Sequence, residues 1–111
     1  MSGDDVSGTL LVTIDESDQE FVISVAGEID LATVESLDAA LRAAERSDCS
    51  CVVVDLAAVS FIDCRGFNSL LAGRQALVRR NIELVVRNPQ RQARSLFDVA
   101  CKASRSENRT A

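Results

Sequence analysis

The chain has 111 residues, of which 47% are hydrophobic and 26% are charged, and its net charge is −5. This balance is typical of one globular domain and excludes a chain that is disordered throughout. No apolar run approaches the roughly 18 residues of a membrane-spanning helix. The polar, acidic residues 1–5 also lack the basic and apolar stretches of a secretory signal. We therefore expect a cytoplasmic protein that does not insert into a membrane.

Four cysteines and the absence of histidine restrict the chemistry. We expect reduced thiols, and Cys49-Ser50-Cys51 has the wrong spacing for a CxxC zinc or redox motif. Cys49, Cys51 and Cys101 are therefore interpreted as structural. Without histidine the sequence lacks the commonest general base, and it shows no glycine-rich phosphate loop. We expect no metal, no cofactor and no catalytic residue, which disfavours a small enzyme or a nucleotide-binding protein.

The two halves of the chain carry opposite charge. Residues 1–63 contain 14 acidic and 2 basic side chains, whereas residues 64–111 contain 3 acidic and 10 basic ones. The asymmetry fits either separately solvated faces or a dipolar surface that binds a charged protein. Nucleic-acid binding is not expected, because the overall charge is acidic and no aromatic residue is interleaved among the basic ones.

Two strands joined by an acidic turn are predicted near the start. Residues 1–8 are polar, and we expect them to form a flexible tail. Residues 9–14 have the composition of a strand, and residues 20–26 alternate between apolar and polar side chains. The pattern predicts a hairpin whose second strand turns one face toward the core. That face consists of Phe21, Ile23 and Val25.

A helix is predicted after the hairpin. The segment Gly27-Glu28-Ile29-Asp30 interrupts the strand pattern, and apolar residues then recur at helical spacing until about residues 47–48. Asp30 is suited to the N-cap, because its carboxylate can accept hydrogen bonds from the free amides of a first turn. The apolar stripe of this helix consists of Val34, Leu37, Leu41 and Ala44.

A buried strand and a second helix follow. Residues 51–56 form an apolar run, which is typical of a central strand covered on both faces, and residues 57–62 continue as an apolar connection. From Asp63 onward the apolar period becomes helical. The predicted stripe of this helix consists of Phe67, Leu70, Leu71, Leu77 and Val78.

The last predicted elements are a strand over residues 82–86 and a third helix. Asn88 is suited to the N-cap of this helix, and Pro89 to its first position. Residues 102–111 are polar, and we expect them to fray. The apolar stripe of the third helix consists of Ala93, Leu96, Phe97, Ala100 and Cys101.

The element order β-β-α-β-α-β-α predicts an α/β fold. Strands that alternate with helices form right-handed βαβ units and so a mostly parallel sheet with helices packed on it. The first strand should pair antiparallel at one side, which makes the sheet mixed.

Two segments carry a family resemblance. Residues 27–33, which read Gly-Glu-Ile-Asp-Leu-Ala-Thr, resemble the GELDxxT segment of STAS domains, the domains of anti-sigma factor antagonists. Residues 53–66, which read VVDLAAVSFIDCRG, resemble the hhhDLsxVxFhDSSG signature of the same family, and residues 85–89 resemble its next strand and NP turn. The resemblance covers residues 9–101 in one register and implies a single STAS domain over that range.

The resemblance implies a regulator that works by switching partners. Such proteins bind an anti-sigma factor, often a kinase of the histidine-kinase-like ATPase class, and thereby free a sigma factor for transcription. A phosphoserine at the start of the helix weakens this complex. Carried over to this chain, the implied partner-binding residues lie in two segments: Asp30 and Thr33, then Ser60, Asp63, Cys64, Arg65, Gly66, Phe67 and Asn68.

The phosphorylated serine of the family corresponds to Arg65, which cannot accept a phosphate. We therefore expect no phosphorylation at this position, and the spacing marks neither Ser60 nor Ser69 as a substitute. A cation in the first turn of a helix opposes the helix dipole. Arg65 either points into water or pairs with Asp63 or Asp30, or it contacts an acidic surface of a partner.

Cys64 and Gly66 each leave two interpretations open. Cys64 is either a small replacement for serine or a redox-sensing thiol, because a helix N-terminus and a nearby arginine favour the thiolate. Asp30 and Asp63 are expected to lie together beside the loop. Gly66 allows either the close approach of a partner or tight packing of helix on strand.

The resemblance also leaves an alternative function. The chain could be a STAS subunit of a larger assembly, such as a lipid-transport ATPase complex or a stress-signalling scaffold. The oligomeric state does not follow from the sequence.

Overall fold

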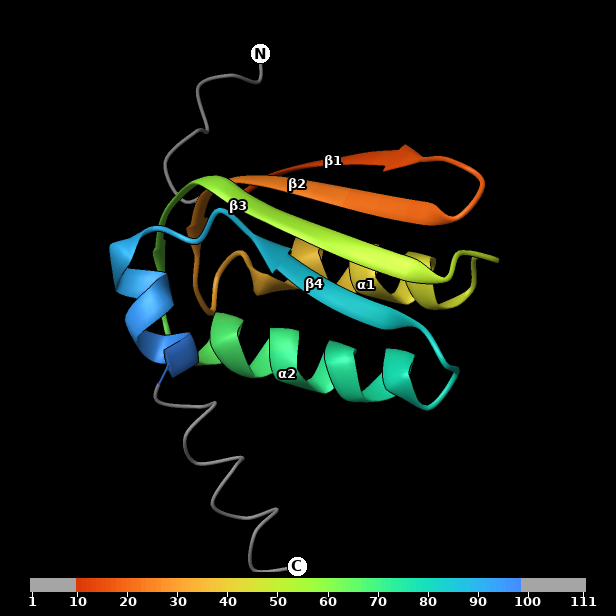
Figure 1. Cartoon of the computed structure of the whole chain (residues 1–111). Coiled ribbons are helices and arrows are strands. Elements are labelled where there is room, and N and C mark those ends of the chain that lie inside the picture. Colours follow the sequence, from red (N-terminus) through yellow and green to blue (C-terminus); the bar gives the residue numbers. More distant parts are fainter. Residues whose placement is uncertain (1–9, 99–111) are drawn as a thin grey trace, which may run out of the picture.

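The computed structural model describes residues 10–98, so the predicted tails at 1–8 and 102–111 lie outside the described residues, as do Ala100 and Cys101. The predicted order of elements is confirmed (Figure 1). The elements are β1 (Leu11–Glu16), β2 (Glu20–Ile29), α1 (Val34–Glu45), β3 (Cys51–Ile62), α2 (Cys64–Val78), β4 (Glu83–Arg87) and a helix over 91–98.

The strands form one mixed sheet in the order β1-β2-β3-β4. β1 pairs antiparallel with β2, while β2, β3 and β4 run parallel to one another, as predicted. Helices α1 and α2 lie side by side on one face of this sheet (Figure 1). The helix over 91–98 lies at the end of the sheet where β2 and β3 finish (Figure 1).

The core lies between the sheet and the two helices. The alternating residues predicted for β2 are all buried, and Leu37, Leu41 and Ala44 of α1 are at most 5% exposed. The stripe of α2 is confirmed at Leu70 and Leu77 but is wrong at Val78, which is 53% exposed. Successive helical residues differ by about 100° around the axis, so Val78 points away from the face that Leu77 buries.

Strands β2 and β3 are longer than the sequence predicted. Gly27 does not end β2. The register against β3 shifts between Gly27 and Glu28, and this irregularity lets the strand continue to Ile29. Gly27 has φ 119°, which glycine adopts without a steric penalty. Residues 57–62 are likewise part of β3 rather than a connection. As a consequence, β2 and β3 end side by side with Ile29 paired to Ile62.

The third helix begins later than predicted. Asn88 is not its N-cap, because Asn88 has φ 58° and its side-chain amide donates to Asp55 Oδ1 at 3.4 Å. The first helical hydrogen bond runs from Arg94 N to Gln90 O at 2.8 Å, so Pro89 precedes the helix. The predicted burial is confirmed within the described part, where Ala93 is 3% exposed and Leu96 and Phe97 pack against the core.

Candidate partner-binding site

The two segments singled out by the sequence meet at the ends of β2 and β3. Asp30 directly follows Ile29, Asp63 directly follows Ile62, and these two isoleucines are register partners. Asp63 N–H also donates to Ile29 O at 3.0 Å, which ties the second segment to the first. Carboxyl ends of parallel strands are common places for binding sites in α/β folds.

Asp63 is the N-cap of α2. Its backbone is extended (φ −96°, ψ −175°), and its carboxylate oxygen Oδ1 accepts a hydrogen bond from Gly66 N at 3.0 Å. Its carbonyl oxygen accepts the first helical bond, from Phe67 N at 2.9 Å. The cap therefore fixes the direction in which α2 starts, and Cys64 and Arg65 occupy its first turn, exposed to solvent.

Gly66 and Phe67 hold this turn against the sheet. A Cβ placed on Gly66 would lie 2.4 Å from Ile29 Cγ2, so the glycine serves tight packing of helix on strand. Phe67 is 9% exposed, and its ring centroid lies 4.9 Å from that of Phe97. Neither residue offers much surface to a partner.

Asp30 stabilises a turn and is not the N-cap of α1, which corrects the prediction. The turn over 31–33 lies between Asp30 and the helix, and the N-cap is Thr33. Asp30 Oδ1 accepts hydrogen bonds from Ala32 N at 3.0 Å and Thr33 N at 3.2 Å. A short carboxylate that binds amides two and three residues ahead is typical of such turns.

Thr33 supports the same turn from inside. It is 5% exposed; its hydroxyl donates to Glu28 O at 2.7 Å and accepts from Asp30 N at 3.0 Å. Thr33 therefore shapes the turn without facing solvent. Among the nine residues implied by the resemblance, four side chains are exposed at this end of the sheet: Ser60, Cys64, Arg65 and Asn68.

Arg65 has no acidic neighbour within salt-bridge distance among residues 10–98. The ion pairs found there are Arg80 with Glu45 and Arg87 with Asp55. The pairing of Arg65 with Asp63 or Asp30, one of the alternatives left open, is therefore not observed. The guanidinium points into solvent from the first turn of α2.

Two apolar residues are exposed at these strand ends. Phe61 lies within the signature segment at residues 53–66, whereas Leu31 was not predicted to be a site residue. Leu31 is 64% exposed and Phe61 is 43% exposed. No local pattern marks Leu31, because its turn is formed by the contacts between Asp30 and Thr33. Phe61 alternates with buried Ile62. We define the strand-end surface as the exposed residues Leu31, Ser60, Phe61, Cys64, Arg65 and Asn68.

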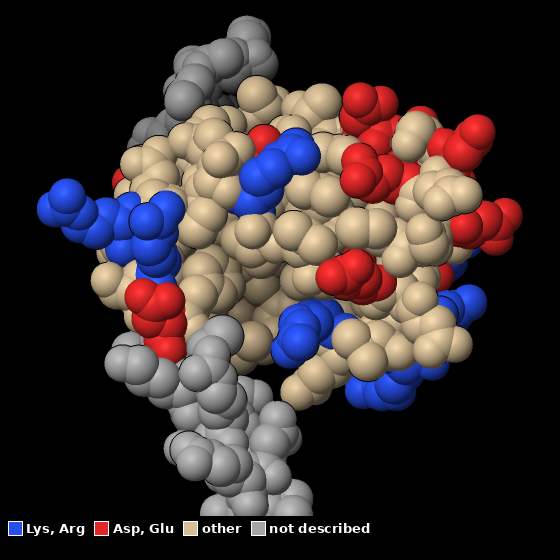
Figure 2. Space-filling model, viewed as in Figure 1, with Lys and Arg blue, Asp and Glu red and all other residues tan. Residues whose placement is uncertain are grey.

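An acidic patch lies at one end of the sheet (Figure 2). Acidic side chains gather over the turn between β1 and β2, at the opposite end of the sheet from the strand-end surface (Figure 2). The exposed acids there are Asp15, Glu16, Asp18 and Glu20. Basic side chains lie at both ends of this face (Figure 2), so the face carries a local acidic patch, and the dipolar surface stays a prediction.

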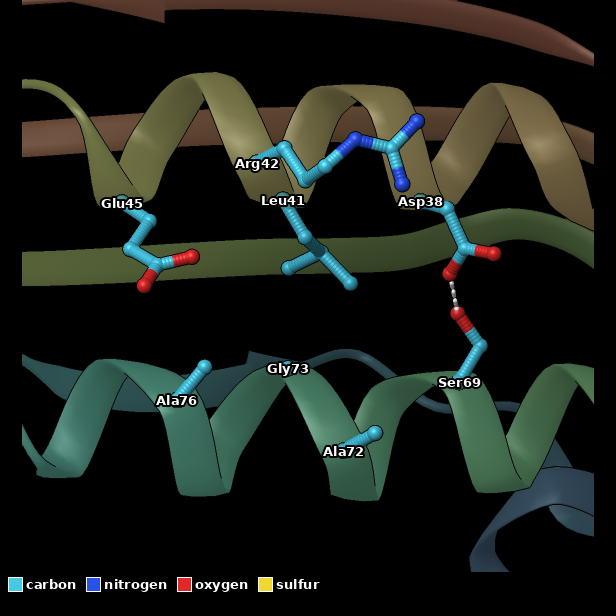
Figure 3. A pocket seen from close by; sticks show the side chains of 8 residues that line it. All are labelled: Asp38, Leu41, Arg42, Glu45, Ser69, Ala72, Gly73 and Ala76. Carbon is cyan, nitrogen blue, oxygen red and sulfur yellow. Dashed lines mark hydrogen bonds between the residues drawn. The ribbon is translucent and has the colours of Figure 1, made fainter.

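A groove of about 180 Å³ lies between α1 and α2, away from the strand-end surface (Figure 3). At one end of it Ser69 Oγ donates to Asp38 Oδ1, and along it Leu41 faces Gly73. Over residues 10–98, no three potential metal-ligating side chains come together. No helix in the described part of the chain has the length and apolar character needed to cross a membrane.

Comparisons with known proteins agree with the fold. A family model described as "Mlab, STAS domain" matches residues 12–101. An anti-sigma factor antagonist from Mycobacterium paratuberculosis is 26% identical with a TM-score of 0.74, and the match covers 87% of this chain and 82% of that chain.

Two further solved structures share the fold at lower identity. The unphosphorylated form of the anti-sigma factor antagonist SpoIIAA, a Bacillus protein, is 21% identical with a TM-score of 0.71, over 81% of this chain and 80% of that chain. The STAS domain of an antisigma-factor antagonist from Rhodobacter sphaeroides is 23% identical with a TM-score of 0.62, over 71% and 86%. No curated protein matches the chain. The match over residues 12–101 shows that this chain belongs to the STAS domain family.

Proposed function

We propose that this chain is an anti-sigma factor antagonist, which binds a kinase-type anti-sigma factor of the histidine-kinase-like ATPase class and so regulates transcription that depends on a sigma factor. The similarity to the antagonist from Mycobacterium paratuberculosis supports the general role. The observation that carries the proposal is the strand-end surface, where an N-capped helix presents Cys64 and Arg65 beside the turn of Asp30.

The chemistry of this surface indicates the kind of partner surface that it fits. Arg65 is an exposed cation that forms no ion pair within residues 10–98, and Leu31 and Phe61 are exposed apolar side chains. Arginine and aromatic residues are enriched at the centres of protein interfaces. A complementary partner would bring a carboxylate to Arg65 and apolar contacts to Leu31 and Phe61.

Arg65 also bears on regulation. A phosphate would add a charge of about −1.5 to −2 at the start of α2, whereas arginine keeps a fixed positive charge there. We therefore propose that complex formation is not switched off by phosphorylation at this position. Oxidation of the exposed thiol of Cys64 is a second way in which complex formation could be regulated, and it stays a prediction.

The proposal treats the chain as a cytoplasmic binding protein without catalytic residues or a cofactor. It is supported by the lack of histidine in the sequence and by the exposure of Ser60, Cys64, Arg65 and Asn68. It involves no direct contact with nucleic acid, because acidic side chains outnumber basic ones 17 to 12.

The direct test is displacement of a sigma factor. The purified chain is added to a complex of the host's kinase-type anti-sigma factor with its sigma factor, and release of the sigma factor is followed by size-exclusion chromatography. Release supports the proposal, and an intact complex at excess chain contradicts it. The kinase class is tested with Arg65→Ser, which restores a hydroxyl: ATP-dependent phosphorylation of the variant but not of the wild type supports it.

A second candidate is a STAS subunit of a larger assembly. It is favoured by the description of the matching family model, which names Mlab rather than an antagonist. Such a subunit would co-purify from the host in a stable complex with transporter or scaffold subunits and would release no sigma factor.

A further inference from the structure

The second half of β3 extends beyond its neighbour β4. The pairing of β3 with β4 ends at Asp55 and Arg87, whereas β3 continues to Ile62. An uncovered strand edge leaves backbone N–H and C=O groups without partners in the sheet. Two glutamine side chains contact this edge instead. Gln90 Nε2 donates to Ala57 O at 2.8 Å, and Gln92 contacts Ile62.

Gln92 bonds both backbone groups of Ile62. Ile62 N–H donates to Gln92 Oε1 at 3.1 Å, and Gln92 Nε2 donates to Ile62 O at 2.8 Å. A primary amide carries an acceptor and a donor side by side, so one side chain supplies both of the contacts that a neighbouring strand would make. The contact spans 30 positions in the sequence and connects the helix over 91–98 to the end of β3.

Ile62 is the residue immediately before the Asp63 cap. Its side chain is 0% exposed and would lie 2.9 Å from a Cβ on Gly66. The same helix also contacts α2 just after the cap, where Phe97 packs on Phe67. The helix over 91–98 therefore contacts the chain before the cap through Gln92 and after it through Phe97.

We propose that Gln92 is a positioning residue for the strand-end surface. It fixes the backbone of Ile62, and through it the Asp63 cap, so that Cys64 and Arg65 face a partner in one orientation. This inference rests on the proposed function for the identity of the partner. A surface that is ordered before binding loses less conformational freedom on association, so it binds more tightly for the same contacts.

The first experiment uses the free chain and needs no partner. Amide hydrogen exchange is measured by NMR for the wild type, Gln92→Ala and the matched control Gln90→Ala. Loss of the hydrogen bond to Ile62 N–H should speed exchange at Ile62 about tenfold in Gln92→Ala. Gln90→Ala removes a contact to the same strand five residues earlier and should leave the Ile62 rate unchanged. Equal Ile62 rates in the wild type and Gln92→Ala would overturn the proposal.

A second variant separates positioning from general packing. In Gln92→Glu the neutral carboxyl group can still make both bonds, whereas in the ionised group the oxygen that replaces Nε2 repels Ile62 O and should open the whole contact, including the bond from Ile62 N–H. Protection of Ile62 should return as the pH falls below the carboxyl's ordinary pKa of about 4.3. Asp63 and Arg91 also carry charge beside this contact. The exchange rate of Ile62 in Gln92→Glu is therefore compared with the wild-type rate at the same pH, which removes their contribution. If Gln92→Glu and Gln92→Ala exchange alike at every pH, Gln92 does not act through this pair of bonds.

The third experiment measures the Kd for the kinase-type anti-sigma factor. Gln92→Ala should raise the Kd about tenfold relative to the wild type, while Gln90→Ala should bind as the wild type does. If the wild type itself does not bind, the proposed function fails while the exchange result still stands. If Ile62 exchanges faster in Gln92→Ala but the Kd is unchanged, the link from Gln92 to binding is wrong.

Discussion

Gly66 lies against Ile29 so closely that a Cβ built on the glycine would come within 2.4 Å of Ile29 Cγ2. The same Cβ would lie 2.9 Å from Ile62 Cγ1, and both isoleucines are 0% exposed. The missing side chain at position 66 therefore lets α2 start directly on the paired ends of β2 and β3. This contact joins the two segments of the site more rigidly than their hydrogen bonds alone.

Gly66→Ala should destabilise the fold by about 1–3 kcal/mol, because the added methyl overpacks two buried isoleucines. The measurement is the free energy of unfolding in urea. Gly73→Ala is the matched control in the same helix, where the added methyl meets the flexible end of Leu41 at 2.8 Å and gains about 1 kcal/mol of helix propensity. Gly73→Ala should therefore lose less stability, and equal losses would contradict the packing argument.

Asp63→Ala should cost about 0.5–2 kcal/mol of stability, because Gly66 N loses the carboxylate oxygen that caps α2. Asp63→Asn keeps an acceptor oxygen but loses the negative charge that favours a helix N-terminus. It should therefore be less stable than the wild type by about 0.3–1 kcal/mol. In thermal or urea unfolding the wild type should thus be the most stable, Asp63→Asn the second and Asp63→Ala the least stable. An alanine variant as stable as the asparagine variant would show that the cap contributes little.

The element types could be predicted because each segment has a clear apolar period. The alternation through Phe21, Ile23 and Val25 and the stripe of Leu37 and Leu41 both reflect residues that the fold buries. The ends of the elements were less predictable, because contacts distant in sequence decide them. Gly27 resembles a strand breaker locally, yet pairing with β3 carries β2 past it.

The start of the third helix shows the same effect. Asn88-Pro89 has the local pattern of a helix start, but Asn88 instead bonds Asp55, a partner 33 residues away. The position of the candidate site was predicted from motifs at strand ends and stays a prediction. The exposure of Leu31 could not be predicted, because only the three-dimensional turn shows that it points outward. The contact of Gln92 with Ile62 likewise has no local signal.

Asp55 should make stability depend on pH. Its pKa lies below the ordinary value of 3.8, chiefly because Ala57 N–H donates to Asp55 Oδ1, with further lowering by Asn88 and Arg87 and an opposing effect of burial. Because the pKa is lower in the folded chain than in the unfolded chain, ionised Asp55 stabilises the fold above pH 3.8. This contribution disappears as the pH falls through the folded pKa.

The stability difference between the wild type and Asp55→Asn should therefore shrink between neutral pH and pH values below 3.8. Urea unfolding at a series of pH values measures it. Asp48→Asn, at an exposed position, is the control for removing a carboxylate. Parallel curves for the wild type and Asp55→Asn would show that Asp55 does not contribute to the pH dependence.

Under the proposed function, Arg65→Glu should weaken binding of the anti-sigma factor by about tenfold, because it reverses the charge that the first turn of α2 would present to an acidic surface of the partner. Arg74→Glu is the matched control, since Arg74 is exposed on the same helix but lies outside the strand-end surface. Calorimetry at two salt concentrations measures both variants. The difference in Kd between the two variants should become smaller at high salt, because the screening length falls from about 10 Å at 0.1 M to about 3 Å at 1 M. If the two variants bind equally well at low salt, Arg65 does not contact the partner, and the interface must lie elsewhere on the domain.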